Sequence, residues 1–311
     1  MNDLFLKYGV LYGKRFRFKD KLKFVNEFAK DIESLGYKVE FQAKKKKFEK
    51  LLNIYVGDMK NAKIIFIAAY DTPTKAFIPQ YKYYPFHTEK NIHSDTICFV
   101  AQFLISMLLV IISFILLSQF NRTELLLKIF ISIIAVILLF FAVVITSGIS
   151  NPFNNNRNTA SVILCYSLAE SLKNRKDIAF VFLDNGISSF SGYRECSARF
   201  IENIDKKKFV ILNALAIGET LVLAHGNQMK EDASLIIKIA NDLVIKDRLY
   251  GVERIDEMVL KYFPLSMILA SGRIWKNEFV VEKSRTAEDY KIDLIRLERI
   301  KRILETYIKS Q

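Results

Sequence analysis

Two long stretches of apolar residues dominate the middle of the chain. Residues 97–117 read ICFVAQFLISMLLVIISFILL and residues 129–147 read IFISIIAVILLFFAVVITS, and neither contains a charged residue. A helix needs roughly 20 apolar residues to cross the hydrocarbon core of a bilayer. Leucines extend the second stretch back to residue 125, and a short polar segment separates the two. The pattern predicts a transmembrane helical hairpin over residues 97–147, with spans at 97–117 and 125–147.

Outside the hairpin, helical and strand periodicities alternate. Apolar residues at helical spacing predict helices at 20–35, 158–172, 188–200, 230–247 and 290–308. Short apolar runs predict strands at 37–42, 51–56, 63–70, 177–183 and 208–215. Strands that alternate with helices predict an α/β domain with a mostly parallel central sheet and helices on both faces. The hairpin interrupts this domain, so we expect its two parts to be residues 1–96 and 148–311.

The charge and the cysteine content of the chain limit its expected partners and its cellular compartment. The net charge is +13, and the lysine run at 44–47 is either a solvated turn or a contact with anionic lipid headgroups. No zinc finger or RNA-binding motif is present, so we expect no nucleic-acid partner. The three cysteines, Cys98, Cys165 and Cys196, form no CxxC pair, which indicates a reducing compartment. The first 30 residues lack an apolar leader, so we expect an integral membrane protein with its soluble part in the cytoplasm.

Five segments outside the hairpin resemble, in the correct order, the motifs of the cocatalytic zinc aminopeptidases, whose fold the glutaminyl cyclases share. The segments are IIFIAAYDT (64–72), NPFNNNRNTASVILCYSLAESL (151–172), IAFVFLDNGISSFSGYRECSARF (178–200), FVILNALAIGETLVL (209–223) and KSRTAEDYKIDLIRLERI (283–300). The resemblance implies an aminopeptidase-like α/β fold. It also implies that the hairpin enters after Asp71, at the carboxyl ends of the strands, so the former active-site face points toward the membrane.

The residues that carry chemistry in this family are replaced here. The resemblance aligns the family's first His with Ala69, its bridging Asp with Arg157 and its general-base Glu with Gly186. It aligns the ligand Glu with Ile187, the ligand Asp with Leu215 and the final His with Arg285. Ala, Gly, Ile and Leu side chains offer a metal no donor atom, and Arg stays cationic. We therefore expect no metal, no other cofactor and no catalytic residue. Asp71 and Asn158 match supporting positions of the family and complete the vestigial pocket.

Two arginines stand where the family holds its metals. Arg157 and Arg285 either pair with Asp71 or Asp184 and hold the pocket together, or bind a carboxylate such as a peptide C-terminus. The polar residues inside the spans include Gln102, Ser106, Ser113 and Ser132, which either contact another membrane protein or lie within the hairpin.

These observations predict a catalytically inactive, membrane-anchored peptidase-like protein that acts as a binding or scaffold subunit of a membrane complex. The expected partners are the lipid bilayer and another membrane protein or a peptide. Nicastrin and nicalin resemble this pattern of a silent aminopeptidase-like domain joined to membrane partners. The alternative is a membrane-bound hydrolase or metallopeptidase that uses unrecognised residues, although the sequence shows no Ser/His/Asp or Cys/His constellation.

Overall fold

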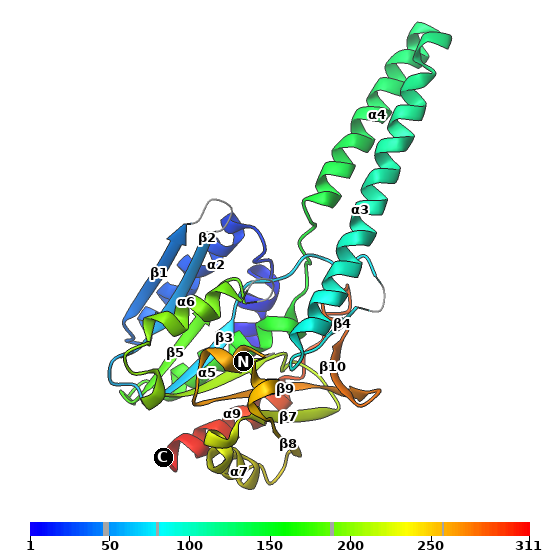
Figure 1. Cartoon of the computed structure of the whole chain (residues 1–311). Coiled ribbons are helices and arrows are strands. Elements are labelled where there is room, and N and C mark those ends of the chain that lie inside the picture. The colour runs from blue at the N-terminus through cyan, green and yellow to red at the C-terminus, as the bar shows by residue number, and fades with distance from the viewer. Residues whose placement is uncertain (46–49, 79–80, 187–189, 257) are drawn as a thin grey trace.

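A mixed β-sheet forms the centre of the protein (Figure 1). The computed structural model describes residues 1–45, 50–78, 81–186, 190–256 and 258–311. Within these ranges ten strands form one sheet, in the order β1-β2-β5-β3-β6-β9-β10-β4, with β7 joined to β9 and β8 to β7. The strands are β1 (Val39–Lys45), β2 (Lys50–Val56), β3 (Ile64–Ala69), β4 (Lys82–Tyr83), β5 (Ile178–Leu183), β6 (Lys208–Asn213), β7 (Thr220–His225), β8 (Ile245–Leu249), β9 (Ser266–Trp275) and β10 (Glu278–Glu282).

The central strands are parallel and are buried on both faces. β3 pairs in parallel with β5 on one side and with β6 on the other, and β6 pairs in parallel with β9. Every residue of β3 and of β5 is buried, which explains why both strands read as unbroken apolar runs. Antiparallel strands then extend the sheet at both ends. The structure confirms the predicted α/β class.

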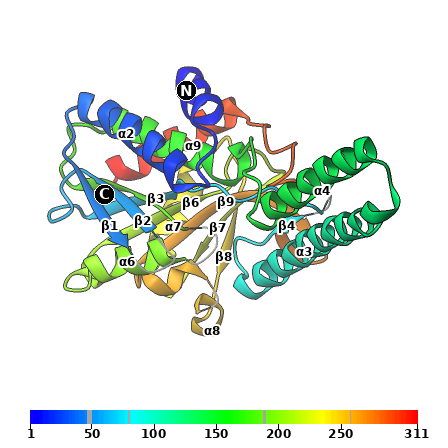
Figure 2. The same ribbon diagram turned by 90° about the horizontal axis from the view of Figure 1, so that it is seen from above.

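Helices cover both faces of this sheet. The α-helices are α1 (Asn2–Phe5), α2 (Phe18–Ser34), α3 (Thr88–Ser118), α4 (Leu125–Thr146), α5 (Ala160–Ser171), α6 (Ser191–Arg199), α7 (Lys230–Ile239), α8 (Val252–Ile255) and α9 (Leu294–Lys309). Buried residues of α2, α5, α7 and α9 share one apolar core, while those of α6 and of the foot of α3 belong to the core on the opposite face. Figure 2 shows α2 and α9 on one side of the sheet and α6 on the other.

Helices α3 and α4 pack against each other and project away from the α/β body (Figure 1). Both are long and apolar enough to cross a membrane, and only 17% of the most apolar window of each is buried. Their contact is made by small and polar residues: the Ser106 hydroxyl donates to the carbonyl of Ala142 (3.1 Å) and accepts from Thr146 Oγ1 (2.9 Å). Large apolar side chains such as Leu126, which is 82% exposed, point outward. This arrangement is typical of helices that pack in lipid.

The serines inside the hairpin therefore bond within it. The Ser113 hydroxyl approaches the carbonyl of Ala135 on the facing helix (3.4 Å), and the Ser132 hydroxyl donates to Lys128 O in its own helix (2.9 Å). For these three serines, the structure agrees with the interpretation that the polar groups bond within the hairpin.

The sequence prediction was wrong in two places. Residues 230–247 do not form one helix, because α7 ends at Ile239 and Ile245–Leu249 form β8, which pairs in parallel with β7. Strands β7, β9 and β10 were not predicted, and β9 even borders the parallel centre of the sheet. Its apolar run is short and passes into Ser271, Gly272 and Arg273, so its strand character depends on pairing with three neighbours.

Candidate functional site

Most of the predicted site residues lie where the central strands and their neighbours end. Ala69 ends β3, Gly186 follows β5, Leu215 follows β6 and Arg285 follows β10. Arg157 and Asn158 belong to a single π-helical turn, Asn155–Thr159, that leads into α5, and such turns are frequent at functional sites. The structure thus brings these positions to one edge of the sheet. Ile187 lies outside the described residues.

The backbone at this edge keeps an unusual conformation. Asn185, Ala214, Lys283 and Arg285 all have φ between +50° and +63°, although none of them is glycine. The left-handed region costs a non-glycine residue about 1–2 kcal/mol. Each of these residues follows a strand end, so the strain is concentrated where the loops carry the site.

Gly186 lies so close to Ala69 that there is no space for a side chain at position 186. A Cβ atom at Gly186 would lie 2.6 Å from the Cβ of Ala69, closer than van der Waals contact allows. The amide of Gly186 donates to Asp71 Oδ1 (3.0 Å), and the Asn158 side-chain amide donates to the carbonyl of Asp71. Asp71 thus holds the loops after β3 and β5 together. A glutamate general base could therefore not be restored at position 186 beside Ala69 without moving the backbone.

Arg157, which the sequence resemblance aligns with the bridging carboxylate, is 4% exposed. Its guanidinium lies 3.5 Å from the centre of the Tyr83 ring and donates to Asn213 Oδ1 (3.0 Å). The amide of Asn213 in turn donates to the Tyr83 hydroxyl (2.8 Å). Within the described ranges, Arg157 makes no ion pair with a carboxylate, so neither Asp71 nor Asp184 is its partner. A cation–π contact and neutral acceptors compensate its charge.

Arg285, which the sequence resemblance aligns with the final His, faces the hairpin. Its Nε donates to the carbonyl of Thr74 and its Nη2 donates to Thr74 Oγ1, both at 2.8 Å. Its Nη1 forms an ion pair with Asp95, which lies on α3 just before the apolar stretch. The guanidinium also lies 4.7 Å from the centre of the Tyr81 ring. Its carboxylate partner is therefore Asp95, which the sequence did not suggest.

Two buried carboxylates complete the site. Asp184 Oδ1 lies 2.5 Å from Lys21 Nζ; burial raises the pKa of Asp184 to about 6, although the Lys21 ammonium lowers it. The Asp289 carboxylate accepts hydrogen bonds from the backbone amides of Asn156 (2.8 Å), Arg157 (3.3 Å) and Arg285 (3.1 Å). Burial raises the pKa of Asp289 from 3.8 to about 7, against the effect of these hydrogen bonds. Asp289 thereby fixes the backbone of both arginines.

A cocatalytic metal pair does not fit these residues. Such a site needs imidazole and carboxylate donors around each ion. Here the edge offers a methyl group at Ala69, a buried isobutyl group at Leu215, no side chain at Gly186 and guanidinium groups at Arg157 and Arg285. The part of the chain that the structure describes contains no group of three His, Cys, Asp or Glu side chains that could hold a metal ion.

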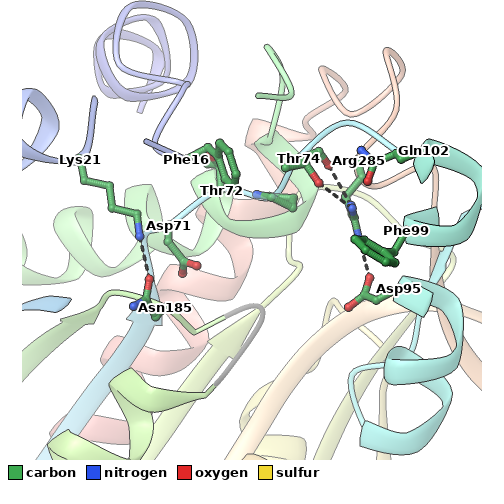
Figure 3. Close-up of a pocket in the computed structure, with 11 residues that line it drawn as sticks. Phe16, Lys21, Asp71, Thr72, Thr74, Asp95, Phe99, Gln102, Asn185 and Arg285 are labelled. Carbon is green, nitrogen blue, oxygen red and sulfur yellow. Dashed lines mark hydrogen bonds and ion pairs between the residues drawn. The ribbon is translucent and has the colours of Figure 1, made fainter. Parts of the chain in front are cut away.

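A cavity of about 310 Å³ lies between this edge and the foot of the hairpin (Figure 3). Lys21, Asp71 and Asn185 line one end, while Arg285, bonded to Thr74 and Asp95, lines the other. The remaining lining residues are Phe16, Thr72, Pro73, Phe99 and Gln102. Arg157 is not among the residues that line this cavity.

Sequence reasoning missed Lys21 and Asp95, although each left a signal. Lys21 interrupts the apolar stripe of α2 that Val25, Phe28 and Ile32 continue, and it is itself buried. A lysine on the buried face of a helix requires a carboxylate partner. Asp95 is a charge directly beside an uncharged stretch, where a partner is also expected. Neither signal names the partner.

Comparison with known proteins gives a fold. No protein-family model matches the sequence, and no curated protein sequence matches it. Solved structures do match: Porphyromonas gingivalis glutaminyl cyclase (TM-score 0.59, 15% identity, 99% of this chain and 96% of that chain) and Fimbriiglobus ruber glutaminyl cyclase (0.54, 12%, 100% and 92%). The Legionella pneumophila LapA aminopeptidase also matches (0.55, 10%, 95% and 65%). At these identities the likeness concerns the fold. The chain has the zinc aminopeptidase-like fold.

Proposed function

We propose that this chain is a catalytically inactive, membrane-anchored peptidase-like protein that acts as a binding or scaffold subunit of a membrane complex. The observation that carries the proposal is the set of residues at the edge of the sheet where the central strands end, which we call the site edge. Gly186 lies too close to Ala69 to carry a side chain, and Arg157, which the sequence resemblance aligns with the bridging carboxylate, lies on the Tyr83 ring. A hydrolytic water has neither a metal nor a general base among these residues.

The scaffold part of the proposal is supported by the way in which the hairpin is attached. Helix α3 continues below the apolar stretch to Thr88 and is bonded to the α/β body by two ion pairs, Asp95 with Arg285 and Lys90 with Glu278. A protein that orients a partner in the membrane relative to a soluble surface needs such a fixed connection. The proposed orientation has the α/β body in the cytoplasm.

The test is purification of the full chain from its native membrane in a mild detergent. We expect sub-stoichiometric zinc, no hydrolysis of aminoacyl substrates, no cyclisation of N-terminal glutamine with or without added Zn²⁺, and a membrane protein that co-purifies in a fixed ratio. A peptidase or cyclase activity that a metal chelator abolishes would refute the inactive state. A chain that purifies alone under several mild conditions would refute the scaffold role.

A further inference from the structure

The cavity between the site edge and the hairpin lies at a defined depth on α3. Asp95 precedes the apolar stretch that begins at Ile97, and Gln102 lies inside it. With a rise of 1.5 Å per residue, these two lining residues are about 10 Å apart along the helix. The headgroup layer on each side of the hydrocarbon core is roughly 5–8 Å thick. If the apolar stretch spans a bilayer, as the proposed function assumes, the cavity opens at the level of the lipid headgroups.

Gln102 is the polar group of this cavity that lacks a partner. It is 8% exposed, and its side-chain nitrogen Nε2 is buried without a hydrogen-bond partner among the described residues. The next polar residue on the same face of α3, Ser106, bonds to the facing helix. A buried amide without a partner is costly, and such a group usually marks a site that an outside acceptor completes.

The charged residues that line the cavity favour a zwitterionic ligand over a simple anion. Two cations, Lys21 and Arg285, and two anions, Asp71 and Asp95, line the cavity. Both cations already have carboxylate partners, Asp184 for Lys21 and Asp95 for Arg285. A ligand with a phosphate alone would meet the two lining carboxylates without a free counter-charge. A ligand with both signs could place its cation toward Asp71 and its phosphate toward Gln102 and Arg285.

The size and the open side of the cavity agree with a lipid. At about 30 Å³ per water molecule, 310 Å³ corresponds to roughly ten waters, which is enough for a headgroup. Phe99 lines the cavity and is 60% exposed, and Phe103 on the same helix is 53% exposed. An acyl chain that leaves the cavity beside Phe99 would therefore run along the outward surface of α3.

We infer that this cavity binds the headgroup of a zwitterionic phospholipid that carries a primary ammonium, as in ethanolamine phospholipids. The primary ammonium can donate hydrogen bonds to the Asp71 carboxylate, which the quaternary ammonium of choline cannot do. The phosphodiester accepts from the Gln102 amide. The bound lipid thus completes the wall between the hairpin and the site edge.

The experiment uses the detergent-solubilised full chain and native mass spectrometry with dihexanoyl phosphatidylethanolamine, phosphatidylcholine and phosphatidylglycerol. We expect one ethanolamine lipid per chain, bound at least about tenfold more tightly than either the choline or the glycerol lipid. Gln102→Leu should weaken this binding by about tenfold, because it removes a donor to a charged group. Among the described residues Gln102 Nε2 has no hydrogen-bond partner that the change would remove. Gln119→Leu, the same change at the far, exposed end of α3, should leave it unchanged.

Tighter binding of the glycerol lipid, or equal binding to wild type and Gln102→Leu, would overturn the assignment. Displacement of the lipid by millimolar inorganic phosphate would show a phosphate site instead and would also overturn it. Alkaline extraction of membranes tests the anchor separately: a chain that stays in the membrane but binds no ethanolamine lipid contradicts this inference and leaves the proposed anchoring intact.

Discussion

The ion pair between Arg285 and Asp95 should couple the hairpin to the site edge, and removing either partner should destabilise their junction. Arg285 follows β10 and Asp95 lies on α3, so the pair joins the sheet to the hairpin. Arg285 also donates two bonds to Thr74, in the segment that leads from β3 toward the hairpin. Thr74 bridges to Ser150, where the chain returns from α4. One guanidinium therefore holds the entry, the exit and the first helix of the hairpin.

The structure sets the expected magnitudes. The Arg285 side chain is 9% exposed and that of Asp95 is 39% exposed, so the pair lies between a surface pair and a buried one. Breaking a buried pair costs about 3–5 kcal/mol and an exposed pair about 0.2–1 kcal/mol. We expect Asp95→Asn to cost about 1–2 kcal/mol. Arg285→Met should cost about 3 kcal/mol, because the carbonyl of Thr74 also loses its donor.

The assay is a double-mutant cycle on unfolding of the full chain in detergent. Trp275, the single tryptophan, ends β9 next to β10 with Lys82 Nζ 3.0 Å from the centre of its ring, so its fluorescence reports on this edge. The double variant should be less destabilised than the sum of the single ones by about 1–2 kcal/mol. Glu278→Gln is the control, since its pair with Lys90 joins the same helix and strand but is more exposed, and it should cost under about 1 kcal/mol. A coupling energy near zero would refute the reasoning.

Three further predictions concern packing and pH. Gly186→Ala should destabilise the chain by about 1–3 kcal/mol in urea unfolding, because the new Cβ would lie 2.6 Å from that of Ala69; Ala69→Gly should restore the loss, and no rescue would argue against this contact. Ser106→Ala should weaken the hairpin by about 0.6–1.7 kcal/mol, measured by steric trapping, whereas Ser132→Ala should have a smaller effect; equal effects would contradict the packing. The stabilising effect of a neutral Asp289 is full below about pH 4 and is lost as the pH rises through about 7, since burial raises its pKa. Wild type should therefore lose on the order of 4 kcal/mol relative to Asp289→Asn over that window, and a gain would show that the three backbone donors outweigh burial.

Much of the fold could be predicted because it depends on local pattern. Uncharged stretches of membrane length identify α3 and α4, and unbroken apolar runs identify β3 and β5, since each reports its own burial. The residue types at Ala69 and Leu215 exclude metal coordination by these two side chains in any fold, because a side chain without donor atoms cannot gain them by folding. Those conclusions required no knowledge of which segments meet.

Only the tertiary structure decided the partners. Arg157 and Arg285 looked equivalent in the sequence, yet one lies on Tyr83 inside the domain and the other pairs with Asp95 on the hairpin. The lysine at position 21 finds Asp184 across more than half of the chain. Residues Ile245–Leu249 form strand β8 because they pair in parallel with the edge of β7. Hydrophobic periodicity indicates whether a residue is buried. Which residue it contacts depends on how distant loops and helices dock, and that geometry arises only when the whole chain packs.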